Sequence, residues 1–585
     1  MFHESFQYFM PVRALYGVGL LSRIGQEVGE FKGLKALVIT DQILEKLGVV
    51  EKLRKGLEGS GVEIAAVFSD VPPNSEVKTV KAAAELGKNS GCNLLIAIGG
   101  GSVMDTAKVT NVLMFKGGEV EDHMGAQLVD EKMYPMIFVP TTAGTGSEAT
   151  IYAMISDTAK QVKLPFAEDR FLPDLAILDP ELTVSMPPKV TASTGMDALT
   201  HAIESYVSTT ASPISRAFSL QAIDLISKYI LAATAHPDDM TARGAMLTAS
   251  FLAGVAINHA GVGMVHALSH AAGGVYHIPH GVANAIFLPF SIDYNLDVAA
   301  EDYARISEVL GELNVYPIHE LQANLANFEN PIIENTLSQL SFVDEWLAKR
   351  KAAALAEKIR RLNRQLAYLS GLPLNLKEAG VNDNLAQLDL LVERGMEDGS
   401  LLYNPKEVKE NDMREIFQKA YHQNLKPEKV SEKSLKLSAA GHVKKRIKGV
   451  FKSAEELYDI LGGFFERIRE NDELREALVA SGLVVRFRYT NPDAAIVLAS
   501  IDGEQKIIMG EEAEKMDVEL ELKLEADLAH VFWHGQMNVV QALARREVIP
   551  KGNLPKAMKL LPILDPAFRM YPEYLREKGL SSLIL

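Results

Sequence analysis

The segment NLLIAIGGGSVMDTAK (residues 93–108) joins an apolar run to a glycine-rich turn and then to a stretch with helical spacing. An apolar run that ends in glycine predicts a buried strand, and the helix is expected to begin near Val103. Because the turn has few side chains, a pyrophosphate can approach its backbone, and the helix N-terminus offers free N–H donors. A tight strand-to-helix turn without a ligand is the alternative interpretation. The turn consists of Gly99, Gly100, Gly101 and Ser102.

Other short apolar runs alternate with helical segments in the first part of the chain. Strands are expected at residues 34–40, 62–68 and 136–142, with a helix over residues 75–90. This alternation predicts an α/β domain with a parallel sheet covered on both faces. A second loop of small and hydroxyl residues, PTTAGTGSE (140–148), follows the last of these strands. Two such loops at strand carboxyl ends form the crevice where α/β sheets bind nucleotides.

Polar residues near these loops support a nucleotide ligand. Asp105 and Lys108 lie on the helix that follows the glycines, and Asp41 comes directly after the first strand. Asp41 would accept hydrogen bonds from the ribose hydroxyls, and its charge would repel a 2′-phosphate. The sequence therefore favours NAD over NADP.

From Pro187 onward the pattern changes to helices. Apolar residues recur at helical spacing over residues 191–208, 212–234 and 241–261, with glycines and alanines that allow close packing. We expect an all-helical domain against the cleft edge of the sheet.

An aspartate and several histidines lie within this helical part at metal-ligand spacing. In STGMDALTHAIESY (193–206), Asp197 and His201 are four residues apart, so a helix places both on one face. The segment GMVHALSHAAGGVYHIPHG (263–281) adds His266, His270, His277 and His280. One carboxylate with neutral imidazoles suits Fe(II), Zn or Mn rather than Ca or Mg. The alternative is a set of ordinary histidines without a metal.

Length and composition are those of a globular protein with several domains. With 585 residues, 47% of them hydrophobic and 23% charged, the chain is too long for one core and fits about three to four domains. The net charge of −16 argues against nucleic acid as a partner. The single cysteine, Cys92, agrees with a reducing cytosol. We expect no signal peptide, no apolar run long enough for stable membrane insertion, and a cytoplasmic location.

The motifs of the first 422 residues resemble those of the iron-containing (group III) alcohol dehydrogenases. GGGSVMDTAK, PTTAGTGSE, LPDLAILDPELT, TGMDALTHAIESY and GMVHALSHAAGGVYHIPHG match that family in its order. The resemblance implies a dehydroquinate synthase-like fold, with an α/β NAD-binding domain over residues 1–185 and an all-α metal-binding domain over residues 186–422. It also implies an enzyme that uses Fe²⁺ (with Zn²⁺ or Mn²⁺ as alternatives) and NAD to interconvert alcohols with aldehydes or ketones. A homo-oligomer is expected by the same resemblance.

The resemblance assigns roles to single residues. The metal ligands would be Asp197, His201, His266 and His280. His270 would lie beside nicotinamide and substrate, and His277 would lie nearby as a proton relay or a substrate-facing group. Asp41 would bind the adenosine ribose. The remaining cofactor contacts would be Gly99, Gly100, Gly101, Ser102 and Asp105 at the first loop and Thr141, Thr142 and Ser147 at the second.

Two segments depart from this pattern. Residues 315–358 exceed what the family usually has there, and we expect an inserted helical segment with Phe342 and Trp346 packing inward. It would cap the active site, widen an interface or be a surface elaboration. Residues 423–449 are expected to form a basic linker, which is either a solvated tether or a weak contact for anionic lipid or for the acidic dehydrogenase surface.

Residues 450–579 resemble the sterol-carrier-protein-2 (SCP-2) family. The resemblance is carried by SAEELYDIL with a capping box at Ser453 and Glu456, by a run of short strands, and by HVFWHGQMNVVQALARREVIPKGN. It implies an α+β domain around an apolar cavity for a fatty or sterol-like ligand. The alternative is a helper domain whose apolar residues fill its own core.

Three functions follow from these patterns. The first is an NAD- and metal-dependent alcohol dehydrogenase whose appended domain recruits or holds an apolar substrate. The second is a lipid-binding carrier that keeps a dehydrogenase scaffold for assembly only. The third is a zinc-dependent relative of the polyol dehydrogenases or cyclases.

Overall fold

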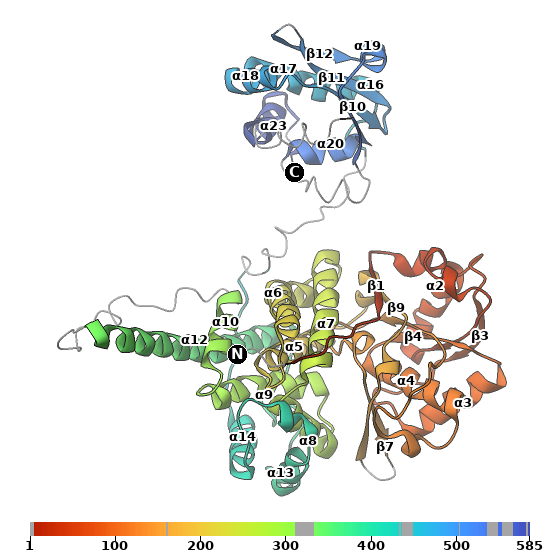
Figure 1. Ribbon diagram of the computed structural model, residues 1–585, viewed down its shortest axis with the longest axis vertical. Helices are drawn as coiled ribbons and strands as arrows, with labels where there is room; N and C mark the ends of the chain where they lie inside the picture. Colours follow the sequence, from red (N-terminus) through yellow and green to blue (C-terminus); the bar gives the residue numbers. More distant parts are fainter. Residues whose placement is uncertain are drawn as a thin grey trace. The chain divides into compact units, whose positions relative to one another are not determined.

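The structure is a computed structural model (Figure 1), which describes residues 5–158, 162–310, 333–431, 435, 449–501, 503–534, 548–552, 565–580 and 583–584. It divides into two compact units, Met1–His442 and Val443–Leu585. Each unit is described by itself.

A six-stranded parallel sheet forms the first part of the first unit. Its strand order is β1 (Arg13–Tyr16), β9 (Leu175–Leu178), β6 (Met136–Pro140), β4 (Leu94–Gly99), β2 (Lys35–Ile39) and β3 (Glu63–Phe68). The expected strands and parallel sheet are confirmed, and so is the helix α3 (Val77–Asn89). The short strands β1 and β9 were not expected from their pattern.

Side chains alternate between the two covered faces of this sheet. Leu37, Ile39 and Leu95 pack with α3 and α4 (Gly101–Lys116) on one face. Ala36, Val38 and Ile96 are buried on the other face, in a core with η1 (Leu20–Gln26) and α2 (Val49–Gly56). Burial on both sides explains why these strands are apolar without interruption.

The direction of the chain reverses between two neighbouring strands. From β2 the chain continues to β3 on one side, whereas from β4 it continues to β6 on the other side. The connections at the carboxyl ends of β2 and β4 therefore diverge, and this is the position in an open parallel sheet where ligands bind. Asp41 and the glycine turn lie at these two ends.

A smaller sheet, which the sequence patterns did not reveal, follows the second loop. It has the order β5 (Gly125–Ala126), β8 (Val162–Ala167) and β7 (Tyr152–Asp157), with β7 and β8 antiparallel. The strand β7 packs against α4, so this sheet backs the helix that follows the glycines.

Helices form the second part of the first unit (Figure 1). They are α5 (Pro188–Val207), α6 (Pro213–Ala235), α7 (Met240–Ala260), α8 (Met264–Tyr276), α9 (His280–Asn295), α10 (Ala300–Val309), α12 (Ile333–Ser370), α13 (Leu388–Met396) and α14 (Glu410–His422). One buried core joins them, and α5 packs against α6, α7 and α9. The expected all-helical part is confirmed.

The sheet part and the helical part meet through backbone at two glycines. Gly146, with φ of 59°, lies in the second loop, and a Cβ on it would be 2.5 Å from the Ser250 carbonyl oxygen on α7. A Cβ on Gly254 of α7 would be 2.5 Å from the Gly146 carbonyl oxygen. Only glycine permits this approach and this backbone conformation together.

The helix α7 is the one described helix whose length and composition alone would suit a membrane span. In the fold, 67% of its apolar window is buried, against α5, α6 and the second loop. Its apolar surface is thus part of the helical core.

The helix α12 extends across part of the segment that departs from the family. Its described side chains begin at Ala348, and Ala352, Leu355 and Ile359 are buried in the helical core. Lys351 Nζ donates to Glu308 Oε1 of α10 at 2.7 Å. Phe342 and Trp346, expected to pack inward, lie outside the residues whose side chains are described.

The beginning of the expected linker lies on the first unit. Glu428 accepts from Arg361 Nε at 2.7 Å and from Arg364 Nη2 at 2.8 Å, and Val430 is buried. These contacts hold Glu428 against α12, so this part of the expected linker is packed on the first unit.

The second unit combines a five-stranded sheet with helices. The strand order is β12 (Glu504–Met509), β11 (Ala494–Ile501), β10 (Val484–Thr490), β13 (Leu520–Glu525) and β14 (Val548–Gly552), and only β10 and β13 pair in parallel. Its main core contains residues of α17 (Gly463–Glu470), α18 (Asp472–Ser481), α20 (Ala526–Trp533) and α23 (Asp565–Glu577). A smaller core on β11 is covered by α19 (Glu511–Lys515).

The capping box expected at the start of this unit is present in half. Ser453 Oγ accepts from the Glu456 amide at 3.3 Å, as expected for an N-cap. The Glu456 carboxylate accepts from the Lys452 amide at 2.7 Å rather than from the Ser453 amide. The Glu456 side chain therefore binds the backbone amide of the residue before the N-cap, not that of the N-cap itself.

We expect Gly281→Ala to lower the thermal midpoint of the first unit. A Cβ at Gly281 would lie 2.2 Å from the Ser193 carbonyl oxygen, so α9 would have to move away from α5. Overpacking of this kind costs about 1–3 kcal/mol. Gly274→Ala in α8 is the matched control, since nothing lies within 4 Å of its Cβ position. Calorimetry that gives both variants the same midpoint would refute the close contact.

Candidate metal centre and nucleotide crevice

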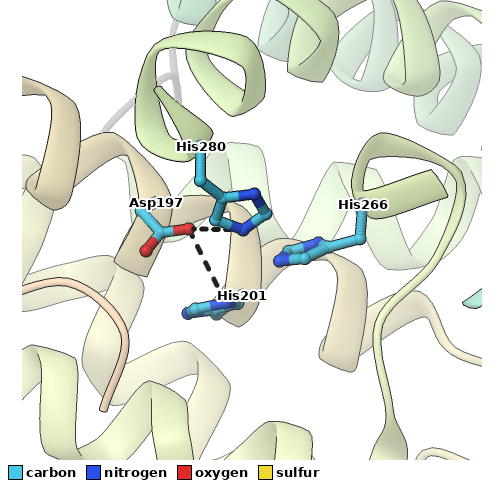
Figure 2. Close-up of side chains that lie close together, drawn as sticks. All are labelled: Asp197, His201, His266 and His280. Atoms are coloured by element: carbon cyan, nitrogen blue, oxygen red, sulfur yellow. Dashed lines mark ion pairs between the residues drawn. The ribbon is translucent and has the colours of Figure 1, made fainter. Parts of the chain in front are cut away.

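Four side chains from three helices converge in the helical part (Figure 2). Asp197 and His201 come from α5, His266 from α8, and His280 is the first residue of α9. One ligand atom from each lies within 4.8 Å of all the others. Asp197 Oδ1 is 3.4 Å from His280 Nε2 and 3.7 Å from His201 Nε2. The structure therefore brings together the four residues that the sequence assigned to the metal.

The chemistry of this cluster fits a metal ion. Three of the four residues, Asp197, His201 and His266, are buried. Among the described residues, no hydrogen-bond partner is found for His266 Nε2. Burial lowers the pKa of His266 and of His280 well below the usual value, so both rings are neutral and offer lone pairs. Buried polar atoms normally have partners, and a cation between these rings would supply one.

Glu204 holds His266 in place, a role that the sequence analysis missed. Its Oε2 lies 2.5 Å from His266 Nδ1, and its Oε1 accepts from the Val265 amide at 2.6 Å. The Nδ1–H is thereby directed to the carboxylate and Nε2 is turned toward the cluster (Figure 2). Burial raises the pKa of Glu204 to about 7, against the lowering by amides of Gly263 and Val265. Its position seven residues after Asp197, on the same helix face, was the available signal.

Asn284 is a second residue that the sequence analysis missed. Its Nδ2 donates to Asp197 Oδ1 at 2.7 Å, from a position one helical turn after His280. Burial raises the pKa of Asp197, and the charge of His201 and the Asn284 bond oppose this rise. Asn284 therefore connects the ligands of α5 and α9.

His270 lies next to the cluster, as the family resemblance implied. Its ring stacks on His280 with centroids 5.2 Å apart, and its Nδ1 bonds to Asp398 Oδ2 at 2.8 Å. Burial alone would raise the pKa of Asp398, but its hydrogen bond and ion pair with His270, with the bond from Ser400, hold it well below the usual value. Asp398 lies far along the chain, at the start of η7 (Gly399–Tyr403), and no sequence pattern indicated it.

His277 does not join the four clustered side chains. It is exposed and ends α8 in the left-handed backbone region, with φ of 57°. This turn reverses the chain so that His280 can begin α9. The relay role expected for His277 remains a prediction.

The nucleotide loops lie at the carboxyl ends of adjacent strands. A Cβ on Gly100 would be 3.1 Å from Thr142 Oγ1, and one on Gly101 would be 2.8 Å from Thr145 Cγ2. The glycines thus allow the second loop to lie directly over the first. The Ser102 hydroxyl donates to the Pro73 carbonyl.

Asp41 caps the helix that follows β2. Its Oδ1 accepts from the Ile43 and Leu44 amides at 2.8 and 2.9 Å, at the start of α1 (Gln42–Lys46). The cap fixes the carboxylate at the edge of the crevice. Thr141 is buried in the second loop, directly after the end of β6.

Asp105 and Ser147, each expected to contact the cofactor, form a hydrogen bond with each other. Ser147 Oγ donates to Asp105 Oδ1 at 3.0 Å, and Lys108 Nζ donates to the Ser147 carbonyl at 2.8 Å. Lys108 also donates to the carbonyls of Thr150 and Tyr152. This network braces the second loop against α4, and direct cofactor contacts by Asp105 and Ser147 remain predictions.

Comparison with known proteins identifies the family. The model described as iron-containing alcohol dehydrogenase matches residues 11–180, and the C-terminal model of the same family matches residues 191–421. The chain belongs to the iron-containing alcohol dehydrogenase family. The family expected from the motifs is confirmed. Neither model reaches the second unit, where the SCP-2 resemblance remains a prediction.

Relatives and solved structures agree over the first unit. The NAD-dependent methanol dehydrogenase of Bacillus methanolicus is 35% identical over 413 residues, covering 71% of this chain and 99% of that protein. The long-chain-alcohol dehydrogenase 1 of Geobacillus thermodenitrificans is 41% identical over 305 residues, covering 52% and 76%. The crystal structure of 1,3-propanediol oxidoreductase has a TM-score of 0.62 and 33% identity, covering 72% of this chain and all of that one.

Glu204→Gln is expected to weaken metal binding by about 10- to 100-fold. This is the usual effect of losing the carboxylate that hydrogen-bonds to a metal-ligating histidine. The amide leaves His266 Nδ1 without a charged partner while the ring stays in place. Metal content after dialysis against graded chelator measures the affinity. The exposed Glu58→Gln is the control and keeps its metal. Unchanged retention in Glu204→Gln would show that the carboxylate does not orient the ligand.

Proposed function

We propose that the chain interconverts alcohols with aldehydes or ketones by transferring a hydride between the substrate carbon and NAD. The single observation that carries this proposal is the convergence of Asp197, His201, His266 and His280 in a unit that also has a nucleotide crevice. Iron and NAD are its cofactors, which the family description and the NAD-dependent relative support.

The four clustered side chains would bind the ion, and neighbouring residues fix the orientation of these ligands. Fe(II) bound there supplies a Lewis acid that stabilises negative charge on the substrate oxygen. Glu204 and Asn284 fix the ring of His266 and the carboxylate of Asp197. Because these partners are buried, the ligands keep their positions when the substrate exchanges.

His270 is the proposed carrier of the alcohol proton. Asp398 fixes its Nδ1 side, which leaves Nε2 to exchange a proton with the substrate. The His270 side chain is 24% exposed, whereas that of His266 is 4% exposed, so His270 also reaches solvent. His277, exposed at the end of α8, is proposed to pass the proton onward.

The crevice is proposed to hold NAD with its pyrophosphate at the N-terminus of α4. Gly99, Gly100, Gly101 and Ser102 form this end of the helix, where amides offer donors to an anion. Thr141 and Thr142 of the second loop lie beside them. Asp41, fixed as a helix cap, is placed to accept from the ribose hydroxyls.

His266→Ala is expected to abolish alcohol oxidation because the ion is lost. The metal-replete enzyme is assayed with NAD and a series of primary alcohols, and bound iron and zinc are measured in the same samples. His236→Ala, an exposed histidine at the end of α6, is the control and keeps both activity and metal. Full turnover with bound metal in His266→Ala would refute the ligand assignment. Tight zinc without any preference for iron would favour the polyol dehydrogenase relatives instead.

The second unit is proposed to bind an apolar molecule that serves as a substrate of the first unit. Its support is a cavity between the sheet and the helices α17, α18 and α20, lined mostly by apolar side chains.

Cys92 is buried and unpaired in the first unit, which supports a reducing compartment such as the cytoplasm. A homo-oligomer is proposed from the family alone.

Deleting residues 450–585 is expected to lower kcat/KM for long-chain alcohols and to leave short alcohols unaffected. The deletion removes the apolar cavity but none of the four clustered side chains. Steady-state kinetics from ethanol to dodecanol on both forms measure the difference. Identical chain-length profiles would discard the coupling between the units.

A further inference from the structure

The start of α8 is held by side chains that belong to other elements. Its N-cap, Gly263, has no side chain with which to cap the first turn, and the amides of that turn need acceptors. One acceptor is the Glu204 carboxylate on α5. The other is Asn404 Oδ1, to which the Met264 amide donates at 3.3 Å. Because His266 lies in this first turn, the orientation of the turn decides where its ring lies.

Two glycines let Asn404 and the residue before it reach the backbone that leads into α8. A Cβ on Gly263 would be 3.1 Å from Asn404 Oδ1 and equally close to Glu204 Oε1. A Cβ on Gly261, which has φ of 67°, would be 2.7 Å from the Tyr403 ring. The turn between α7 and α8 therefore allows both side chains to lie directly against it.

The Asn404 side-chain amide uses both of its donors and both of its acceptor positions. Besides the Met264 amide, its Oδ1 accepts from Asn295 Nδ2 at 3.1 Å. Its Nδ2 donates to Asn295 Oδ1 at 2.9 Å and to the Lys406 carbonyl at 2.6 Å. Both asparagines are buried, with 6% of Asn404 and 1% of Asn295 exposed. A carboxylate could not donate to Asn295, and an apolar side chain would leave the Met264 amide without this acceptor.

The pair of asparagines joins two helices that carry clustered ligands. Asn295 is the last residue of α9, and His280 is the first. His266 is the third residue of α8, whose first amide binds Asn404. Asn404 therefore holds the start of α8 to the end of α9.

The segment that ends at Asn404 also reaches His270. The short helix η7 lies between Asp398, its N-cap, and Asn404, its C-cap, and it packs on α8. Asp398 bonds to His270 at one end of η7, and Asn404 binds the Met264 amide at the other end. This segment thus contacts α8 at two points, and His266 lies between them in the sequence.

We propose that Asn404 is a positioning residue for the metal centre. By capping α8 and holding it to α9, Asn404 sets the direction from which His266 Nε2 meets the ion. Its action passes through the α8 backbone, so removing the Asn404 amide misplaces a ligand without deleting one. The inference rests on the proposed function, because it takes an ion to be bound among the four clustered side chains.

The visible absorption of Co²⁺ bound to the full-length chain tests the proposal. This ion binds nitrogen and oxygen ligands, and its spectrum depends on how they are arranged around it. Asn404→Ala is expected to lower the Co²⁺ affinity of the metal-free protein at least tenfold, as the loss of a group that orients a ligand usually does. It is also expected to shift the absorption bands of the Co²⁺-saturated protein. An affinity and a spectrum equal to those of the unsubstituted chain would overturn the proposal.

Asn375→Ala is the matched control that separates positioning from stability. Asn375 is 7% exposed, and both atoms of its amide bond to Glu378 rather than to α8. Both variants are expected to lower the thermal midpoint of the metal-free protein, but only Asn404→Ala is expected to change the Co²⁺ spectrum. The same spectral shift in Asn375→Ala would show that lost stability alone alters the site, which overturns the proposal.

Asn295→Ala decides the question if Asn404→Ala does not fold. This variant keeps Asn404 Oδ1 available to the Met264 amide and removes the bonds from Asn404 to α9. The Co²⁺ bands are then expected to shift in the same spectral measurement, because α8 is no longer held to α9. An unchanged spectrum in Asn295→Ala would overturn the proposal.

His266→Ala distinguishes this inference from the proposed function. That variant is expected to lose tight Co²⁺ binding, because one of the four clustered side chains is removed. Tight binding with an unchanged spectrum in His266→Ala would contradict the ligand assignment and the proposed function with it. Loss of binding in His266→Ala together with an unchanged spectrum and affinity in Asn404→Ala would overturn the inference alone.

Discussion

The buried convergence of one carboxylate and three imidazoles is the constraint on which the first unit depends. Buried imidazole nitrogens that lack hydrogen-bond partners are unfavourable in a core, and a metal ion among the rings would accept their lone pairs. The fold maintains this arrangement by bringing α5, α8 and α9 close together, with Gly281 allowing α9 to touch α5. Hydrogen bonds from Glu204 and Asn284 then fix the orientation of the ligands.

Much of the first unit was predictable from sequence because the local residue patterns there match the burial that the tertiary fold requires. Apolar runs such as residues 94–99 are strands because both faces of the sheet are buried. Asp197 and His201 share a helix face because they are four residues apart. His266 and His280 could be assigned by family resemblance, although their approach to α5 depends on packing that no local pattern contains.

Residues that act through long-range contacts could not be predicted in this way. Asp398 reaches His270 across 128 positions of the chain, and neither residue's neighbourhood indicates the other. Asp105 and Ser147 are a similar case. Their carboxylate and hydroxyl suggested contacts with a ligand, but they bond to each other, and the Ser147 hydroxyl also accepts from Lys108. Polar residues near a crevice serve either the ligand or the loop, and only the distances distinguish the two.

The contact between Gly146 and Gly254 has a consequence for how the two parts of the first unit fit together. The clustered ligands belong to the helices, while the glycine turn and its companion loop belong to the sheet. Where these parts touch, main chain faces main chain with no side chain between them. How closely these two parts approach is therefore set by backbone atoms, and any side chain larger than hydrogen at either glycine would push the second loop away from α7.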